Sequence, residues 1–328
     1  MLRIHYTQFQ ERRRGGYGDL SMQFGGEGLI MRRISFLLIN IVIFLYLCTT
    51  IESSCAITID LLGTTTVCLR KQKQKTIRKS GKEYEVWLKD IETKKLQPDL
   101  ETRYGTGFLV SHKNRIYLVT AAHVARDMSS EAEVLWNTAS GILHYTFAEV
   151  QQELPHAKWF FHPAADVAIH PFGFTGKVKP KHSFVGEHAF IAEGERLPLG
   201  TKIYVLGFPL SLGVGDILSP LSKKAEIASW ITTIDDPDIN PNLKFILLDE
   251  DLATGYSGAP VFISPEPLVT DSSVRQGMHS RLRLIGILSA NISDNTGGNI
   301  SLVVPVSYLT EIFESNDFRE YERISGIQ

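Results

Sequence analysis

The chain has 328 residues, 43% of them hydrophobic, which is enough to bury one sizeable core or two smaller ones. Lys and Arg number 34 against 36 Asp and Glu, and this formal net charge of -2 excludes a basic protein built to bind nucleic acid through bulk charge. Three cysteines, Cys48, Cys55 and Cys68, are too few for a small scaffold held by disulfides. The fold must therefore be stabilised by burial of apolar side chains.

An apolar segment over residues 34–48 follows a pair of arginines. Its length lies between a signal-peptide core of about 7–15 residues and a membrane-spanning helix of about 20, so two interpretations remain open. The small residues Ser54 and Ala56 suit signal peptidase and predict cleavage after Ala56. The alternative is an uncleaved anchor over residues 34–50. Both predict export of the remainder, which is then periplasmic, secreted or anchored in the membrane.

Beyond residue 56 the chain reads as short apolar runs that are rich in Ile, Val, Leu, Tyr and Phe and end at Gly, Pro, Asn, Asp or Lys, which is typical of β-strands in a sandwich or barrel. Two helical patterns are expected, a single turn in AAHVARDM and an amphipathic helix that begins at Ser307. The basic stretch over residues 70–82 is interpreted as a solvated hairpin loop. The expected strands are AITIDLL, GTTTVCLR, EYEVWLK, GTGFLVS, RIYLVTA, KIYVLGFP, LKFILLD, APVFIS, LRLIGILSA and ISLVVPV.

A weakly periodic stretch rich in Gly, Lys and Pro predicts a connector between two halves that are each the size of a small β-barrel. The expected organisation is an N-terminal extension with a signal peptide or anchor over residues 1–56, a first barrel over 57–172, a connector over 173–199, a second barrel over 200–305, and a C-terminal helix and tail over 306–328.

Three segments each place one member of a proton-relay set in a suitable local setting. His123 follows the strand-like YLVT and two alanines, and Asp166 precedes the apolar VAI. Ser257 lies between Gly255 and Gly258 in GYSGAP, where glycines allow a sharp bend. A serine hydroxyl becomes a nucleophile when a histidine takes its proton and an aspartate orients that histidine. The backbone N–H groups of Gly255 and Ser257 could hold the oxyanion of a tetrahedral intermediate.

The motifs TAAH, DVAI and GYSGAP, in this order, resemble the active-site segments of trypsin-like, chymotrypsin-fold serine peptidases. The resemblance covers about residues 58–310. It implies an all-β fold of two perpendicular β-barrels with the active site in the cleft between them, and a short C-terminal helix. It also implies a serine endopeptidase acting through an acyl-enzyme intermediate on a protein or peptide substrate, with no metal or organic cofactor. Val124 stands where the animal enzymes have a cysteine, so the chain resembles the disulfide-free bacterial type.

Specificity is harder to predict. Asp251 stands six residues before Ser257, where trypsin has its pocket aspartate, and this resemblance would imply cleavage after Lys or Arg. In the alternative interpretation Asp251 caps a turn or faces solvent. The resemblance also implies that Ser289 and Ala290 lie beside the bound peptide, and that Ser289 touches Asp166.

Several alternatives compete with this interpretation. His162 and His170 flank Asp166, but neither an HExxH motif nor paired cysteines accompany them, so we interpret them as loop or strand-end residues and expect no metal site. Cys68 is interpreted as a small apolar strand residue. An α/β-hydrolase would need its acid and histidine after Ser257, which the order contradicts. The remaining alternative is a catalytically inactive peptide-binding module of the same fold, held at the membrane by residues 34–50.

Overall fold

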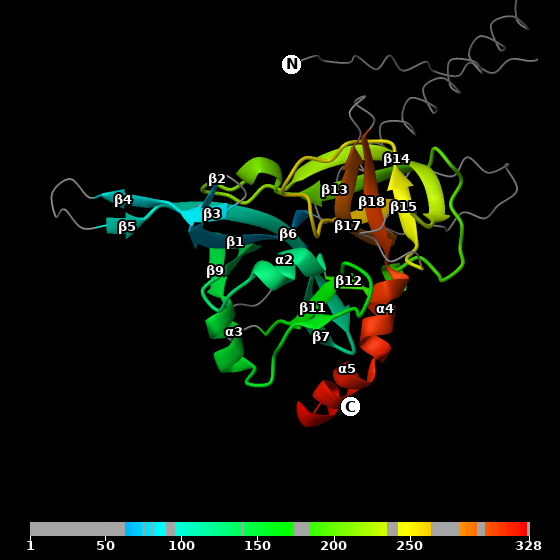
Figure 1. Ribbon diagram of the computed structural model, residues 1–328. Helices are drawn as coiled ribbons and strands as arrows, with labels where there is room; N and C mark the ends of the chain where they lie inside the picture. Colours follow the sequence, from blue (N-terminus) through cyan, green and yellow to red (C-terminus); the bar gives the residue numbers. More distant parts are fainter. Residues whose placement is uncertain are drawn as a thin grey trace, which may run out of the picture. The chain divides into compact units, whose positions relative to one another are not determined.

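Strands dominate the described part of the chain, as the short apolar runs predicted (Figure 1). The computed structural model describes residues 63–74, 76–79, 82–89, 96–138, 141–173, 184–234, 242–263, 283–293 and 299–326. The apolar segment, the predicted cleavage site and the expected strand AITIDLL lie outside these ranges. Within them, no helix is long and apolar enough to span a membrane.

The first half of the β structure is an eight-stranded sheet. Its strands pair in the order β10-β11-β7-β6-β1-β8-β9, and β12 adds to β6 in parallel. The central strand β6 is long enough to pair with β1 along one edge and with β7 and β12 elsewhere. The strands are β1 (Thr66–Gln74), β6 (Leu100–His112), β7 (Arg115–Thr120), β8 (Glu133–Thr138), β9 (Gly141–Thr146), β10 (Phe160–Phe161), β11 (Ala168–Pro171) and β12 (Val185–Gly186).

The second half is a closed barrel in the order β13-β14-β15-β18-β17-β16. All of its neighbouring strands run antiparallel, and register shifts that mark bulges occur between β14 and β15, between β16 and β17, and between β17 and β18. The molecule therefore has the two-part β architecture, with a short helical C-terminus, that the sequence predicted. The strands are β13 (Lys202–Gly207), β14 (Leu221–Thr232), β15 (Phe245–Leu248), β16 (Pro260–Ile263), β17 (Leu284–Ser293) and β18 (Asn299–Pro305).

The basic stretch over residues 70–82 is mostly strand, so its interpretation as a loop was wrong. The end of β1 pairs with β6 as far as Gln74, and the chain continues into an arm of two hairpins (Figure 1). Backbone pairing supplies the hydrogen bonds here, so alternating polar side chains can form a strand without an apolar face. The hairpin strands are β2 (Thr76–Lys79), β3 (Lys82–Glu85), β4 (Trp87–Lys89) and β5 (Leu96–Pro98).

The helices agree with the sequence in part. The expected turn after β7 is α2 (Ala122–Asp127), and the C-terminal pattern is two helices, α4 (Ser307–Glu314) and α5 (Asn316–Ile324), because Ser315 caps the second one by accepting from the Phe318 N–H. Sequence analysis missed α3 (Phe147–Glu153), which begins with a capping box. The stretch interpreted as a connector contains β12 and the 3₁₀ turn η1 (Glu187–Ala189).

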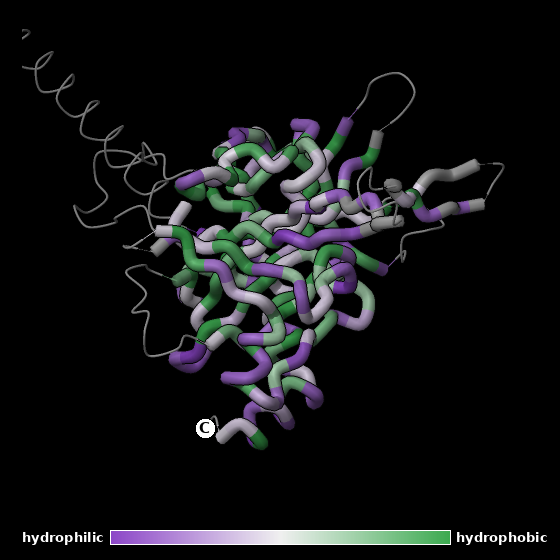
Figure 2. Tube along the Cα trace, turned by 90° about the vertical axis from the view of Figure 1, so that its left-hand side faces the viewer, coloured by the Kyte–Doolittle hydropathy of each residue, from purple (hydrophilic) through white to green (hydrophobic). Residues whose placement is uncertain are grey.

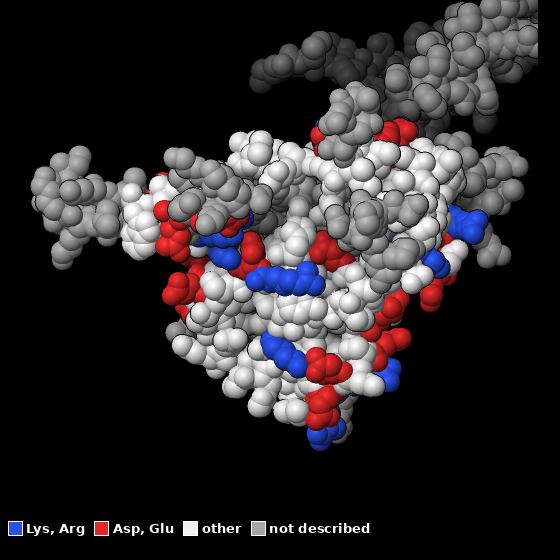
Figure 3. Space-filling view, in the orientation of Figure 1, with Lys and Arg blue, Asp and Glu red and all other residues white. Residues whose placement is uncertain are grey.

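One buried cluster joins both halves of the structure to the C-terminal helices. It takes side chains from β6 and β7, from β13, β16, β17 and β18, and from α4 and α5. In Figure 2 the hydrophobic residues of the described part lie mainly toward its interior, and on the face in Figure 3 acidic and basic side chains are interspersed. Buried members of this cluster include Phe108, Tyr117, Leu206, Phe262, Leu284, Val304, Leu309, Phe313 and Phe318.

Cys68 lies in β1 with 0% of its surface exposed, as the sequence predicted. Burial raises the pKa of its thiol to about 12, despite the opposing positive charge of Arg70. The thiol is therefore protonated at neutral pH and chemically inert.

Candidate active site

His123 lies where β7 gives way to α2. The preceding Ala121 and Ala122 are fully buried, which fixes the backbone, while the His123 side chain is half exposed. Its Nδ1 lies 2.7 Å from Asp166 Oδ2, and its backbone N–H donates to Asp166 Oδ1 at 2.8 Å. A carboxylate only accepts, so Nδ1 carries the proton in the neutral ring and Nε2 is left as the base.

Asp166 lies in the loop between β10 and β11 and accepts a third hydrogen bond, from Ser289 Oγ at 2.7 Å. Burial by itself raises the pKa of Asp166, but the hydrogen bonds from His123 and Ser289 outweigh it and the pKa is lowered. The pKa of His123 is raised, mainly by its hydrogen bond to Asp166. The predicted contact between Ser289 and Asp166 is therefore present, and Asp166 is the carboxylate that orients the imidazole.

Ser257 lies in a tight turn that only glycines permit on both sides. Gly255 and Gly258 have φ values of +105° and +85°. A Cβ on Gly258 would overlap the Thr106 carbonyl oxygen and Thr120 Oγ1. The turn is pinned to the first sheet, because the Thr106 N–H donates to the Ser257 carbonyl at 3.1 Å. The nucleophile candidate is thus held against the sheet that carries His123.

His123 and Ser257 line one pocket of about 420 Å³. In this conformation the Ser257 hydroxyl donates to the Ser289 carbonyl at 3.4 Å and makes no hydrogen bond to His123. Apo active sites often have long or poorly aligned hydrogen bonds of this kind. The rest of the lining comes from Lys71, Thr102, Arg103, Tyr104, Gly105, Val124, Asp127, Met128, Leu210, Ser211, Thr254 and Gly255.

The orientation of the Gly255 and Ser257 N–H groups is fixed, because the carbonyl of each of these two peptide groups accepts a hydrogen bond. The Thr254 carbonyl accepts from the Leu210 N–H at 3.0 Å, and the Tyr256 carbonyl accepts from the Ala259 N–H at 2.8 Å. In a trans peptide the N–H points opposite to the C=O, so the Gly255 and Ser257 N–H groups point away from these partners. Neither N–H has an acceptor among the described residues. They are available to an oxyanion.

Thr106 organises this turn and was missed by the sequence analysis. Its buried Oγ1 donates to the Gly255 carbonyl at 2.7 Å and accepts from the Phe208 N–H at 3.0 Å. One side chain thereby connects β6 to the turn at Gly255 and to the end of β13 at Phe208. The only signal in the sequence was a polar residue between two glycines in GTG, which does not reveal the partners.

The segment that carries this arrangement matches a known protein family. Residues 105–266 match the family described as trypsin-like peptidase domain, and this segment contains His123, Asp166 and Ser257. The chain carries a trypsin-like serine peptidase domain. A comparison with curated protein sequences finds no significant match.

Three solved structures are similar to the chain that carries this peptidase domain. An HtrA-type protease, AlgW, with a tripeptide matches at 15% identity and a TM-score of 0.46, over 80% of this chain and 62% of that chain. An inactive form of Rv3671c from M. tuberculosis matches at 15% identity and 0.45, over 79% and 91%. The MamO protease domain from Magnetospirillum magneticum matches at 14% identity and 0.46, over 76% and 96%. The chain thus spans less than two thirds of the AlgW chain that it matches.

The predicted specificity residues of the peptidase domain lie before the Ser257 turn and on β17. Asp251 is exposed and accepts a hydrogen bond from Asn291 Nδ2 at 2.8 Å. Asn291 follows Ser289 and Ala290 on β17, and Ala290 is exposed. Asp249 accepts from the Glu226 N–H at 2.8 Å. None of the predicted specificity residues, Asp251, Ser289 and Ala290, lines the 420 Å³ pocket.

The two flanking histidines of the peptidase domain are both buried. His170 lies within β11, and His162 lies at the end of β10. Among the described residues, no group of three or more His, Cys, Asp or Glu side chains is placed to hold a metal ion.

Proposed function

We propose that the chain is a serine endopeptidase in which Ser257 is the nucleophile, His123 the general base and Asp166 the residue that orients His123. The observation that carries the proposal is the hydrogen-bonded pair of His123 and Asp166, which shares one pocket with Ser257. The N–H groups of Gly255 and Ser257, which have no acceptor among the described residues, support the same role.

The proposed reaction begins when the Ser257 hydroxyl turns from the Ser289 carbonyl toward His123 Nε2. Oγ then bonds to the scissile carbonyl carbon while its proton passes to Nε2. The carbonyl oxygen becomes an oxyanion, which the N–H groups of Gly255 and Ser257 stabilise by about 3–4 kcal/mol per donor. Collapse breaks the C–N bond, and the proton on Nε2 goes to the leaving amine. A water deprotonated by His123 then hydrolyses the acyl-enzyme and restores Ser257.

We also propose export of this domain, because the arginine-flanked apolar segment over residues 34–48 precedes it. The N-terminal peptide of the protein recovered from cells tests this. A mature chain that begins at Ile57 supports cleavage after Ala56, and a chain that retains residues 34–50 in the membrane fraction supports the anchor. Recovery of the intact chain from the cytosol contradicts export in either form.

The enzymatic role is tested with a fluorophosphonate probe and a protein substrate. We expect a covalent adduct on Ser257, located by peptide mapping, and hydrolysis that Ser257→Ala and His123→Ala each lower by at least about 10³-fold. The matched control is Ser222→Ala, because Ser222 is an exposed serine on β14 outside the pocket. A folded wild-type chain that neither reacts with the probe nor cleaves the substrate contradicts the proposal and favours the inactive peptide-binding module.

A further inference from the structure

His162 is a buried histidine, 7% exposed, that precedes Asp166 by four residues and has no part in the reaction above. We propose that His162 is a positioning residue for Asp166, which holds the loop over residues 162–167 in the shape that presents the carboxylate to His123. This inference rests on the proposed function.

The imidazole of His162 is an acceptor for the backbone of its own loop. Its Nδ1 accepts from the Ala165 N–H at 2.7 Å and from the Ala164 N–H at 3.2 Å. Backbone N–H groups only donate, so these bonds assign the ring proton to Nε2. The ring therefore fixes two peptide groups that a solvent-exposed loop would leave to water.

The backbone of His162 closes the same loop from the other end. Its N–H donates to the Val167 carbonyl at 3.0 Å, and the Val167 N–H donates to the Ala165 carbonyl at 2.8 Å. Asp166 stands between Ala165 and Val167, so His162 holds both of its neighbours. Beyond Val167 the chain is held independently, because Ala168 pairs with Thr120 in the sheet. The N-terminal side of Asp166 thus depends on the His162 ring.

The ring itself is oriented by the C-terminal helix α4. His162 Nε2 lies 3.0 Å from Glu311 Oε2, and its ring meets Tyr308 edge-on at 4.9 Å between centroids. Tyr308 is held in turn, because its hydroxyl accepts from the Lys244 N–H at 3.1 Å. A contiguous set of contacts therefore runs from α4 through His162 to the loop of the catalytic acid.

A small shift of this loop matters because Asp166 must meet three donors at once. The His123 N–H, His123 Nδ1 and Ser289 Oγ all lie 2.7–2.8 Å from its carboxylate. A misplacement of about 1 Å in a catalytic group can cost on the order of 10²-fold in rate. His162 does not line the substrate pocket, so the loss is expected in kcat rather than in KM.

Two substitutions of His162 distinguish the role of ring nitrogen Nδ1 from that of Nε2. His162→Asn keeps an acceptor oxygen near the position of Nδ1 but loses the contact with Glu311. His162→Gln keeps a donor that reaches Glu311 but loses the acceptor for Ala164 and Ala165. With one peptide substrate, we expect His162→Gln to lower kcat by about 10- to 100-fold with KM changed less than about threefold. We expect His162→Asn to recover most of this loss.

The inference is overturned if His162→Asn and His162→Gln have the same kcat. This holds whether that shared kcat equals the wild-type value or lies below it. If thermal unfolding shows that His162→Gln does not fold, substitutions of the exposed Glu311 provide the test instead. Glu311→Ala is then expected to lower kcat about 3- to 10-fold at constant KM, and Glu311→Gln, which keeps an acceptor, to restore it. Equal kcat in wild type, Glu311→Ala and Glu311→Gln overturns the inference. A wild-type chain without Ser257-dependent turnover instead overturns the proposed function, and this inference with it.

Discussion

At the scale of single residues, the site depends on one ionised carboxylate. Asp166 stays charged because three hydrogen bonds offset its burial, and that charge favours the protonated form of His123. The same pair fixes which ring nitrogen is free to act as base. The electrostatics of this pair therefore predict how turnover depends on pH.

The acid limb of the pH profile should lie above the ordinary histidine value of about 6.5. A base must be neutral, and the pKa of His123 is raised by its hydrogen bond to Asp166, so activity falls as the pH drops through that raised value. Asp166→Asn should move this limb of kcat/KM to lower pH and lower kcat by about 10³- to 10⁴-fold. If wild type and Asp166→Asn show the same midpoint for the acid limb of kcat/KM, this prediction is contradicted. Ser222→Ala serves as the control with an unchanged profile.

At the scale of elements, the active-site turn is built from contacts that cross the two β units. Thr106 on β6 holds the Gly255 carbonyl and the Phe208 N–H, and its own N–H holds the Ser257 carbonyl. The first sheet therefore contributes to the shape of the turn, beside bonds within the second barrel such as that from the Gly258 N–H to the Leu288 carbonyl at 2.8 Å. The side-chain hydrogen bonds and the backbone hydrogen bond of Thr106 contribute separately to the shape of the turn. A substitution can remove only the side-chain hydrogen bonds.

Thr106→Val tests the side-chain part of this arrangement. Valine has nearly the shape of threonine, but the buried Gly255 carbonyl and Phe208 N–H lose their partner, which should destabilise the fold by about 1–3 kcal/mol. Release of the Gly255 carbonyl should also lower kcat by about 10- to 100-fold. Urea unfolding and steady-state kinetics give the two values. Thr106→Ser, which keeps the hydroxyl, is the control, and a kcat for Thr106→Val equal to that of Thr106→Ser would refute the role of the hydroxyl.

The motifs for His123, Asp166 and Ser257 could be predicted from the sequence because each carries its local setting with it, in adjacent strand residues or glycines. Thr106 and His162 could not, because their partners lie in the folded turn and loop and not in a sequence pattern. The elements follow the same division. Most strands with an apolar face were found, although β8, with Val134, Leu135 and Trp136 buried, was missed. The polar strand β14 and the end of β1 were also missed, since backbone pairing rather than side-chain pattern defines them.

At the scale of the whole molecule, the stability of the fold should depend on pH through a buried histidine. His170 is 1% exposed, and its ring meets Phe147 and Trp159 edge-on. Burial lowers its pKa to about 4, although its hydrogen bond to the Pro171 carbonyl acts in the opposite direction. The folded protein therefore keeps this ring neutral at pH values where the unfolded chain is protonated.

Between pH about 6.5 and about 4 the unfolded state binds one more proton at His170, so stability falls as the pH falls through this window. The loss amounts to about 3 kcal/mol in total. His170→Phe removes this titration. The unfolding free energy of the wild type minus that of the variant, measured in urea at pH 7 and pH 4.5, should therefore be lower at pH 4.5. All other groups titrate in both proteins and cancel. A difference that stays constant with pH would show that His170 is not neutral in the fold.

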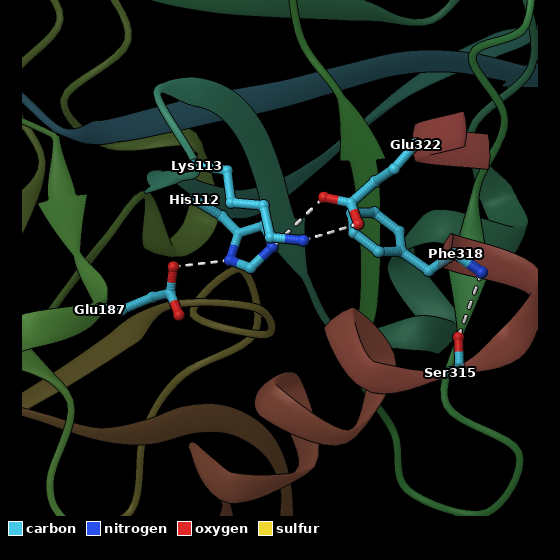
Figure 4. Close-up of polar contacts among 6 residues, drawn as sticks. All are labelled: His112, Lys113, Glu187, Ser315, Phe318 and Glu322. Carbon is cyan, nitrogen blue, oxygen red and sulfur yellow. Dashed lines mark hydrogen bonds and ion pairs between the residues drawn. The ribbon is translucent and has the colours of Figure 1, made fainter. Parts of the chain in front are cut away.

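Polar contacts around His112 on β6 also hold the C-terminal helices to the first sheet (Figure 4). Its ring stacks on Phe313 at 4.1 Å between centroids. Nδ1 lies 2.5 Å from Glu187 Oε1, and Nε2 lies 3.5 Å from Glu322 Oε1. The other oxygen of Glu322 accepts from Lys113 Nζ at 2.9 Å. The Glu322 side chain is 6% exposed, and its Oε1 and His112 Nε2 make no hydrogen bond, so among the described residues the carboxylate depends on Lys113 for its hydrogen bond.

Lys113→Met should therefore destabilise the protein by about 1–3 kcal/mol, because it leaves the Glu322 carboxylate buried beside His112 alone. Methionine and lysine tolerate the positive φ of 46° at this turn position about equally, so the backbone adds little. The matched control is Lys158→Met, whose partner Asp317 is 66% exposed and whose loss should cost less than about 1 kcal/mol. Both pairs join the C-terminal region to the first half of the chain. Lys158 Nζ also lies 5.1 Å from the centroid of the Phe160 ring, so the loss in Lys158→Met includes this contact and the comparison understates the effect of burial. In urea unfolding, the double variant Lys113→Met with Glu322→Gln should regain part of the loss, since the amide carries no charge. Equal losses in the two lysine variants would show that burial of Glu322 does not govern this attachment.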